Sequence, residues 1–135
     1  MAQNYTVVTK YGKITVSRNA IAKAAVDSLE DMGSRVILCS RRGKILKKNG
    51  AAEFAAVEVE SIQGDIRLTV NVIVKFGISI TKTADDIAGS ISEAVRHTLG
   101  RAPSAITVMV RGVISQNKVA PRNLTIRREL EVQGR

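Results

Sequence analysis

The sequence predicts an α+β fold: a two-layer sandwich with two helices on one face of a mixed β-sheet of about four to six strands. Residues 66–76 alternate apolar and polar side chains strictly, as a half-buried strand does. Residues 83–99 carry apolar side chains at helical spacing, and so does a shorter segment after residue 17. Two helices are too few to cover both faces of the sheet, so we expect both on one face.

The chain order predicted from these patterns is strand, helix, three strands, helix, strand. Residues 11–16 form the first predicted strand, because β-branched side chains alternate there with polar ones. Ser17 has the side chain of a helix N-cap, whose hydroxyl accepts from a backbone N–H one turn on. Residues 36–39 are all apolar and predict a short buried strand. Cys39 is therefore interpreted as a core residue rather than a reactive thiol.

Two further strands are predicted to form a hairpin, residues 53–62 and 66–76, around a tight reversal at 63–65. Glu58 and Glu60 fall on the polar face of the first of these strands. We interpret them as solvent-facing side chains rather than a catalytic pair, because no second acid or base is placed opposite them.

The longest predicted strand also carries a second, more polar face. Solvent exposure and a protein–protein surface are both compatible with its mixed polarity, and edge pairing with another copy is a second route to assembly. The residues on this face are Arg67, Thr69, Asn71, Ile73 and Lys75.

The second helix is predicted to begin after an N-cap at Thr83 and to end at Gly100, a residue typical of helix C-termini. His97 lies near that end, where a cation is favoured, and is interpreted as a surface histidine. Residues 105–114 alternate again and predict the last firm strand. If this strand runs parallel to residues 66–76, the connection between them should be a right-handed crossover.

Positive charge is the strongest compositional signal. The chain has 21 Lys and Arg against 12 Asp and Glu, a net charge of +9. Such a balance points to anionic partners. Two interpretations stay open for the densest cluster, contact with a polyanion or partner and a solvated loop tip. The cluster comprises Arg41, Arg42, Lys44, Lys47 and Lys48, and a weaker candidate contact in the C-terminal tail comprises Arg122, Arg127 and Arg128.

Several classes of site are not indicated by the sequence. A single Cys and a single His predict neither an intrachain disulfide nor a His/Cys metal site. Gly43 and Lys44 lack the spacing of a phosphate-binding loop, so no nucleotide cofactor is expected. No apolar run approaches the ~20 residues of a membrane span, and the N-terminus lacks the pattern of a signal peptide. We therefore expect a cytoplasmic protein with no catalytic, metal or cofactor site.

Three segments taken together resemble a known family. Residues 12–17 read Gly-Lys-Ile-Thr-Val-Ser, residues 75–80 read Lys-Phe-Gly-Ile-Ser-Ile, and residues 106–113 read Ile-Thr-Val-Met-Val-Arg-Gly-Val. In this order, around the predicted helices, they resemble the alkaline shock protein family, the envelope stress response proteins of Gram-positive bacteria. The resemblance covers about residues 11–115, so we expect one domain over residues 1–115.

The resemblance implies a non-enzymatic role in envelope stress response and cell-envelope homeostasis, as a membrane-proximal scaffold acting through protein–protein contacts. It implies a protein partner, such as a small membrane-anchored protein, together with self-association and no small-molecule substrate. An anionic membrane surface is a further candidate partner, because the flanks of the chain are basic. Residues 116–135 lie outside it and are expected to form a basic tail, either an edge strand or partly disordered. The alternative is a nucleic-acid-binding module that uses residues 41–48 and the basic tail, although the four aromatic residues are few for base stacking.

Overall fold

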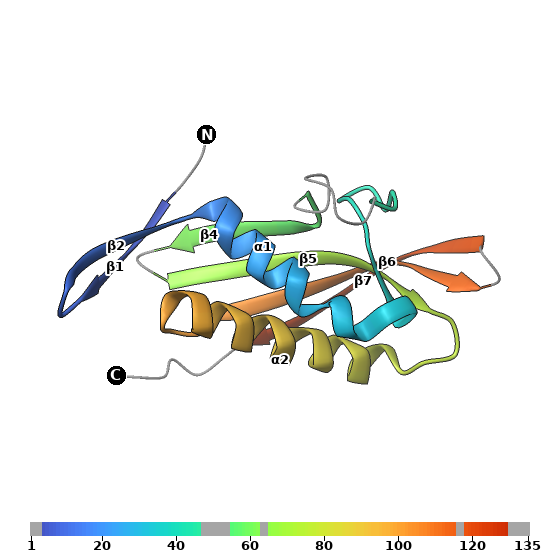
Figure 1. Ribbon diagram of the computed structural model, residues 1–135. Coiled ribbons are helices and arrows are strands. Elements are labelled where there is room, and N and C mark those ends of the chain that lie inside the picture. The colour runs from blue at the N-terminus through green and yellow to red at the C-terminus, as the bar shows by residue number, and fades with distance from the viewer. Residues whose placement is uncertain (1–3, 47–54, 63–64, 116–117, 130–135) are drawn as a thin grey trace.

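The computed structural model describes residues 4–46, 55–62, 65–115 and 118–129. It confirms the predicted α+β fold, with two α-helices, one 3₁₀ helix and a mixed five-stranded sheet beside a separate hairpin (Figure 1). In chain order the elements are β1 (Asn4–Thr9), β2 (Gly12–Ser17), α1 (Arg18–Ser28), η1 (Glu30–Arg35), β3 (Val36–Leu38), β4 (Val57–Ile62), β5 (Asp65–Lys75), α2 (Ile80–Leu99), β6 (Ala105–Ser115) and β7 (Lys118–Glu129).

Strand β5 lies at the centre of the sheet. One of its edges pairs with β6 in parallel, and α2 makes the crossover between these two strands. Its other edge is divided between two antiparallel neighbours, β4 along residues 65–70 and β3 along residues 72–74. β7 pairs antiparallel with β6 and forms the opposite edge of the sheet. The predicted hairpin of the two central strands is thus present as β4 and β5.

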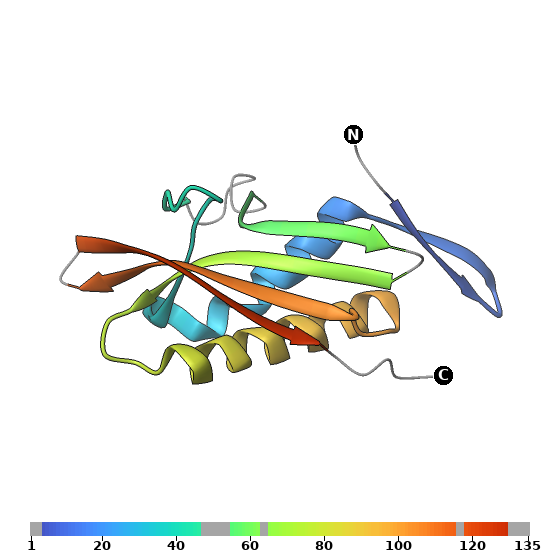
Figure 2. The same ribbon diagram turned by 180° about the vertical axis from the view of Figure 1, so that it is seen from behind.

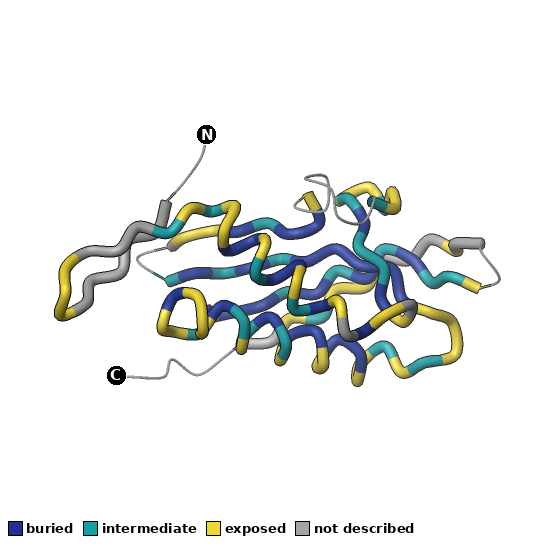
Figure 3. The backbone as a smooth tube through the Cα atoms, viewed as in Figure 1, coloured by how far each residue is buried: buried dark blue, intermediate teal, exposed yellow. Residues whose placement is uncertain are grey.

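Both α-helices cover the same face of the sheet, and the view from behind shows the other face without helices (Figure 2). The alternating apolar residues of β5 belong to the core cluster that they share with the helices, and Leu68, Val70 and Val72 are fully buried there. Figure 3 shows buried segments, in dark blue, along the central strands and at intervals along both α-helices. Ile87 and Ile91 of α2 are equally buried in the same cluster. Each such side chain contributes about 1.5–3 kcal/mol by leaving water. Across the described ranges, no helix is both long and apolar enough to cross a membrane.

The first predicted strand is present as β2, but it does not join the main sheet. It pairs antiparallel with β1 through a two-residue turn at Lys10 and Tyr11, in the register Thr9↔Gly12. Gly12 has a φ of 126°, a conformation that L-residues rarely adopt. The resulting hairpin projects from one end of the molecule (Figure 1).

The caps of the two α-helices can be compared with the predicted ones. Ser17 is the N-cap of α1, as predicted, and its Oγ accepts from the backbone N–H of Ala20 at 3.1 Å. The predicted N-cap at Thr83 is wrong. Ser79 caps α2, and Thr83 is a buried residue of the first turn that donates its N–H to the Ser79 carbonyl at 3.0 Å. Gly100 ends α2 in the left-handed conformation, with a φ of 81°, as expected.

We expect Ser79→Ala to lower the free energy of unfolding by about 1 kcal/mol, because the N–H of Lys82 loses its acceptor at 3.2 Å. Ser79→Asp is the matched control and should stay close to wild type, since aspartate caps as well as serine. Urea unfolding followed by far-UV circular dichroism measures both. Equal stability of the alanine variant and wild type would contradict the assignment.

Candidate functional site

The densest basic cluster begins in a tight turn between β3 and β4. Ser40 donates its N–H to the Lys44 carbonyl and accepts the Gly43 N–H, both at 2.8 Å. Its Oγ also accepts from the N–H groups of Arg42 and Lys44, at 3.3 and 3.1 Å. Gly43 adopts a φ of 86°, which a residue with a side chain rarely does. The backbone therefore fixes this turn, and we call residues 40–46 the basic turn.

The side chains of Arg41, Arg42 and Lys44 are all exposed on the basic turn. Lys47 and Lys48, the other two members of the predicted cluster, lie outside the described residues. The turn thus presents three cations to solvent within the part of the loop that the structure describes.

Arg41 is engaged within the protein. Its Nη2 donates to Glu58 Oε1 on β4. The hydrogen bond to Glu58 and the charge of that carboxylate raise the pKa of Arg41 above its usual value. Arg42 and Lys44 make no ion pair with any other described residue. They are therefore the cations of the basic turn that remain available to a partner.

Beneath the basic turn, a buried amide joins three segments of the chain. Asn71 of β5 is fully buried, and its Nδ2 donates to the Ala56 carbonyl at 3.2 Å. Its Oδ1 accepts from Arg111 Nε at 3.0 Å. Arg111 lies at an irregularity in β6, where the register with β5 shifts. A Cβ on Gly43 would lie 3.7 Å from the Arg111 Cβ, so the turn packs over this arginine.

The sequence does not predict these hydrogen bonds of the Asn71 side chain. The sequence predicts Asn71 on the polar face of its strand, where it lies, but does not predict its complete burial. The available signal was an amide in the middle of a run of β-branched apolar residues, since a buried amide needs partners for its donor and its acceptor.

Cys39 is the first residue after β3, where the chain leaves the edge of the sheet. Its backbone N–H donates to the Asn71 carbonyl at 3.1 Å, and its side chain is buried, as predicted. Burial raises the pKa of the thiol from its usual 9.0 to about 11, although the nearby Arg111 charge lowers it in part. The thiol is protonated at neutral pH and has little nucleophilic character.

The candidate contact in the tail lies on the far edge of the sheet. Arg127 is exposed on β7, opposite Thr107 of β6. Arg122 and Arg128 belong to the same strand, and their side chains lie outside the described part of the structure. Because β7 and the β3–β4 edge are separated by β5 and β6, the structure does not bring the tail and the basic turn into one patch.

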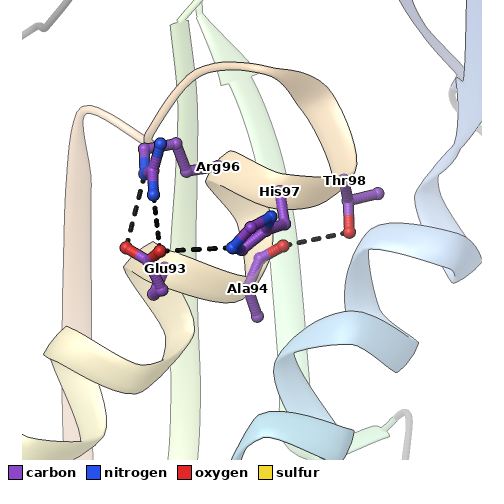
Figure 4. A network of polar contacts seen from close by, with 5 residues as sticks. All are labelled: Glu93, Ala94, Arg96, His97 and Thr98. Atoms are coloured by element: carbon purple, nitrogen blue, oxygen red, sulfur yellow. Dashed lines mark hydrogen bonds and ion pairs between the residues drawn. The ribbon is translucent and has the colours of Figure 1, made fainter.

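The C-terminal turns of α2 carry a surface network (Figure 4). Glu93 accepts from Arg96 and lies 3.3 Å from His97 Nε2, and Thr98 Oγ1 donates to the Ala94 carbonyl. The hydrogen bond from Arg96 lowers the pKa of Glu93, and the charges of Arg96 and His97 act in the same direction. His97 is exposed, as predicted. The described residues include no group of three or more His, Cys, Asp or Glu that could hold a metal ion.

The structure is thus an α+β domain with both α-helices on one face of the sheet and an exposed basic turn between β3 and β4. Residues 6–115 match the model of the alkaline shock protein 23 family, described as having a cell envelope-related function, and the chain belongs to this family. The chain is also 30% identical over 111 residues to the "uncharacterized protein YloU" of Bacillus subtilis strain 168, an alignment that covers 78% of this chain and 91% of that protein. No solved structure matches it. The family resemblance seen in the sequence is thereby confirmed.

We expect Asn71→Ala to destabilise the fold by about 2–3 kcal/mol, because the buried Ala56 carbonyl and the Arg111 guanidinium each lose a partner. Thr69→Ala, two residues earlier on the same face, is the matched control and should cost less than about 1 kcal/mol. Chemical unfolding measures both. Equal losses in the two variants would contradict a stabilising role for the buried amide.

Cys39 should make stability fall at alkaline pH. The folded-state pKa is raised, so the contribution of the thiol is complete below pH 9.0 and is lost as the pH rises towards about 11. The unfolded thiol ionises over this interval while the buried one does not, which lowers the free energy of unfolding by about 2–3 kcal/mol.

Urea unfolding of wild type and Cys39→Ala at pH 8 and pH 11 isolates this contribution of the thiol. The gap between the two proteins should change by the stated amount in favour of the alanine variant. A gap that stays constant with pH would contradict a raised pKa.

Proposed function

We propose that this protein is a non-enzymatic scaffold for cell-envelope homeostasis and envelope stress response. It acts in the cytoplasm, at the inner face of the cell membrane, through protein–protein contacts. The observation that carries the proposal is the match of residues 6–115 to a family with a cell envelope-related function.

The basic turn supports a position close to an anionic membrane. Arg42 and Lys44 are exposed on a backbone-fixed turn, and neither pairs with a described carboxylate. Near an anionic surface each such cation contributes about 1 kcal/mol. Together they add about 2 kcal/mol, an enrichment of about thirtyfold.

The same magnitude supports a protein partner. An attraction of about 2 kcal/mol is weaker than that of a single myristoyl chain, which itself gives only reversible membrane binding. Stable residence at the membrane therefore needs a second contact. A small membrane-anchored protein supplies that contact in our proposal, and the basic turn contributes orientation and additional affinity.

The test reverses the two available cations. Arg42→Glu with Lys44→Glu should reduce sedimentation with vesicles that contain about 30% anionic lipid by at least tenfold at low salt. In cells, the same variant should shift from the membrane fraction to the soluble fraction. Wild-type binding should also weaken as salt is raised, because the interaction is electrostatic.

Lys75→Glu with Lys82→Glu is the matched control. Both residues are exposed and lie away from the basic turn, and the double reversal lowers the net charge of +9 by the same amount. This control should retain most of the vesicle binding. Equal losses in both variants would reduce the effect to net charge alone. A wild-type protein found wholly in the soluble fraction, with no partner captured by crosslinking in cells, would contradict the scaffold role.

A further inference from the structure

The basic turn carries an exposed apolar side chain among its cations. Ile45 is 48% exposed and directly follows Lys44 in the turn. Its backbone forms an isolated antiparallel bridge with Cys39, and the next N–H, that of Leu46, donates to the Leu38 carbonyl at 3.2 Å. The backbone therefore holds Ile45 in place, and its β-branched side chain has few rotamers with which to withdraw from solvent.

The surroundings of Ile45 distinguish it from two side chains that are more exposed. Single apolar side chains on a surface are ordinary. The ring of Tyr11 already has Lys10 Nζ over it, 5.1 Å from the centroid, and Phe76 directly follows one exposed lysine, Lys75. Ile45 instead shares its turn with the two cations that make no ion pair with any other described residue. An apolar group beside available cations is suited to the interface of a bilayer, which accommodates both.

The backbone of the basic turn has hydrogen-bond partners that do not depend on water. Polar backbone groups that approach an apolar environment must keep such partners. Figures 1 and 2 show the turn projecting from the sheet on the side away from α2, so a flat surface can reach it. The backbone N–H groups that donate within the protein are those of Ser40, Arg42, Gly43, Lys44 and Leu46.

We propose that Ile45 inserts into the interface of an anionic bilayer when the basic turn binds there. The insertion rests on the membrane contact of the proposed function and adds an apolar component to it. Arg42 and Lys44 keep their charges at the lipid phosphates on long apolar stems, while Ile45 enters the boundary between the headgroups and the acyl chains. Burial of the exposed half of this side chain should raise the affinity for the bilayer about fivefold.

The apolar contact gives the site a second kind of selectivity. Charge responds to the surface potential of a membrane, whereas insertion also depends on lipid composition and on curvature. A site that uses both distinguishes membranes of equal charge by how easily their interface admits a side chain. The attachment of the protein is then coupled to the state of the membrane as well as to its charge.

Vesicle binding by the purified full chain measures the apolar contribution. Ile45→Ser should bind vesicles that contain about 30% anionic lipid about fivefold more weakly than wild type at low salt. Phe76→Ser removes a more exposed apolar side chain outside the basic turn and should bind as wild type does. Thermal unfolding of both variants separates a lost contact from a lost fold.

Tryptophan fluorescence tests the insertion itself, because the chain contains no tryptophan of its own. Ile45→Trp should bind at least as tightly as wild type. On anionic vesicles its emission should shift to shorter wavelength and should be quenched by brominated lipids. Phe76→Trp is the matched probe outside the basic turn and should show neither change.

Vesicle size tests the predicted selectivity. Small, highly curved vesicles should bind wild type more tightly than large vesicles of the same composition, because curvature loosens the packing of the outer leaflet. Ile45→Ser should lose most of this preference. Arg42→Glu with Lys44→Glu should instead lose affinity for vesicles of both sizes.

The results distinguish the insertion from the proposed function. Equal binding of Ile45→Ser and wild type, or an unshifted emission of bound Ile45→Trp, would overturn the insertion and leave an electrostatic contact in place. Equal shifts in the two tryptophan variants would overturn it as well, because the contact would then not be specific to the basic turn. A wild type that binds no anionic vesicles at low salt would overturn the insertion together with the membrane contact on which it rests.

Discussion

The division of one edge of β5 between two strands is the constraint on which the rest of the structure depends. β4 pairs with residues 65–70 of β5 and β3 pairs with residues 72–74. The two strands therefore follow one another along the same edge but do not form one continuous strand. The chain between them must leave the sheet at Asn71. There the Asn71 carbonyl accepts from the Cys39 N–H, and its amide group donates to the Ala56 carbonyl. The basic turn lies in the segment between β3 and β4 that this division requires. The Asn71 backbone carbonyl holds the Cys39 end of that segment to the sheet, and the Asn71 side-chain amide holds the Ala56 end.

The sequence predicted the elements whose burial repeats along the strand or helix. The alternation in residues 66–76 identified β5 because one face of that strand packs on both helices. Prediction from the sequence failed where two local signals compete, at the N-cap of α2. Ser79 and Thr83 can both cap a helix, and the choice falls on Ser79 because Ile80 already packs against the core. The separate hairpin of β1 and β2 could not be predicted either, because alternation within β2 does not specify which strand it pairs with.

The sequence predicts the candidate site as one run of basic residues, and the structure distinguishes the members of that run by their contacts. Arg41 is held by Glu58, which lies 17 residues further along the chain. The sequence does not predict this pair, because it forms only when β4 lies beside the basic turn in the folded chain. Arg127 is predicted as a contact in the C-terminal tail, and the strand order places it at the opposite edge of the sheet from the turn. The net charge of +9 is thus distributed over separate surfaces.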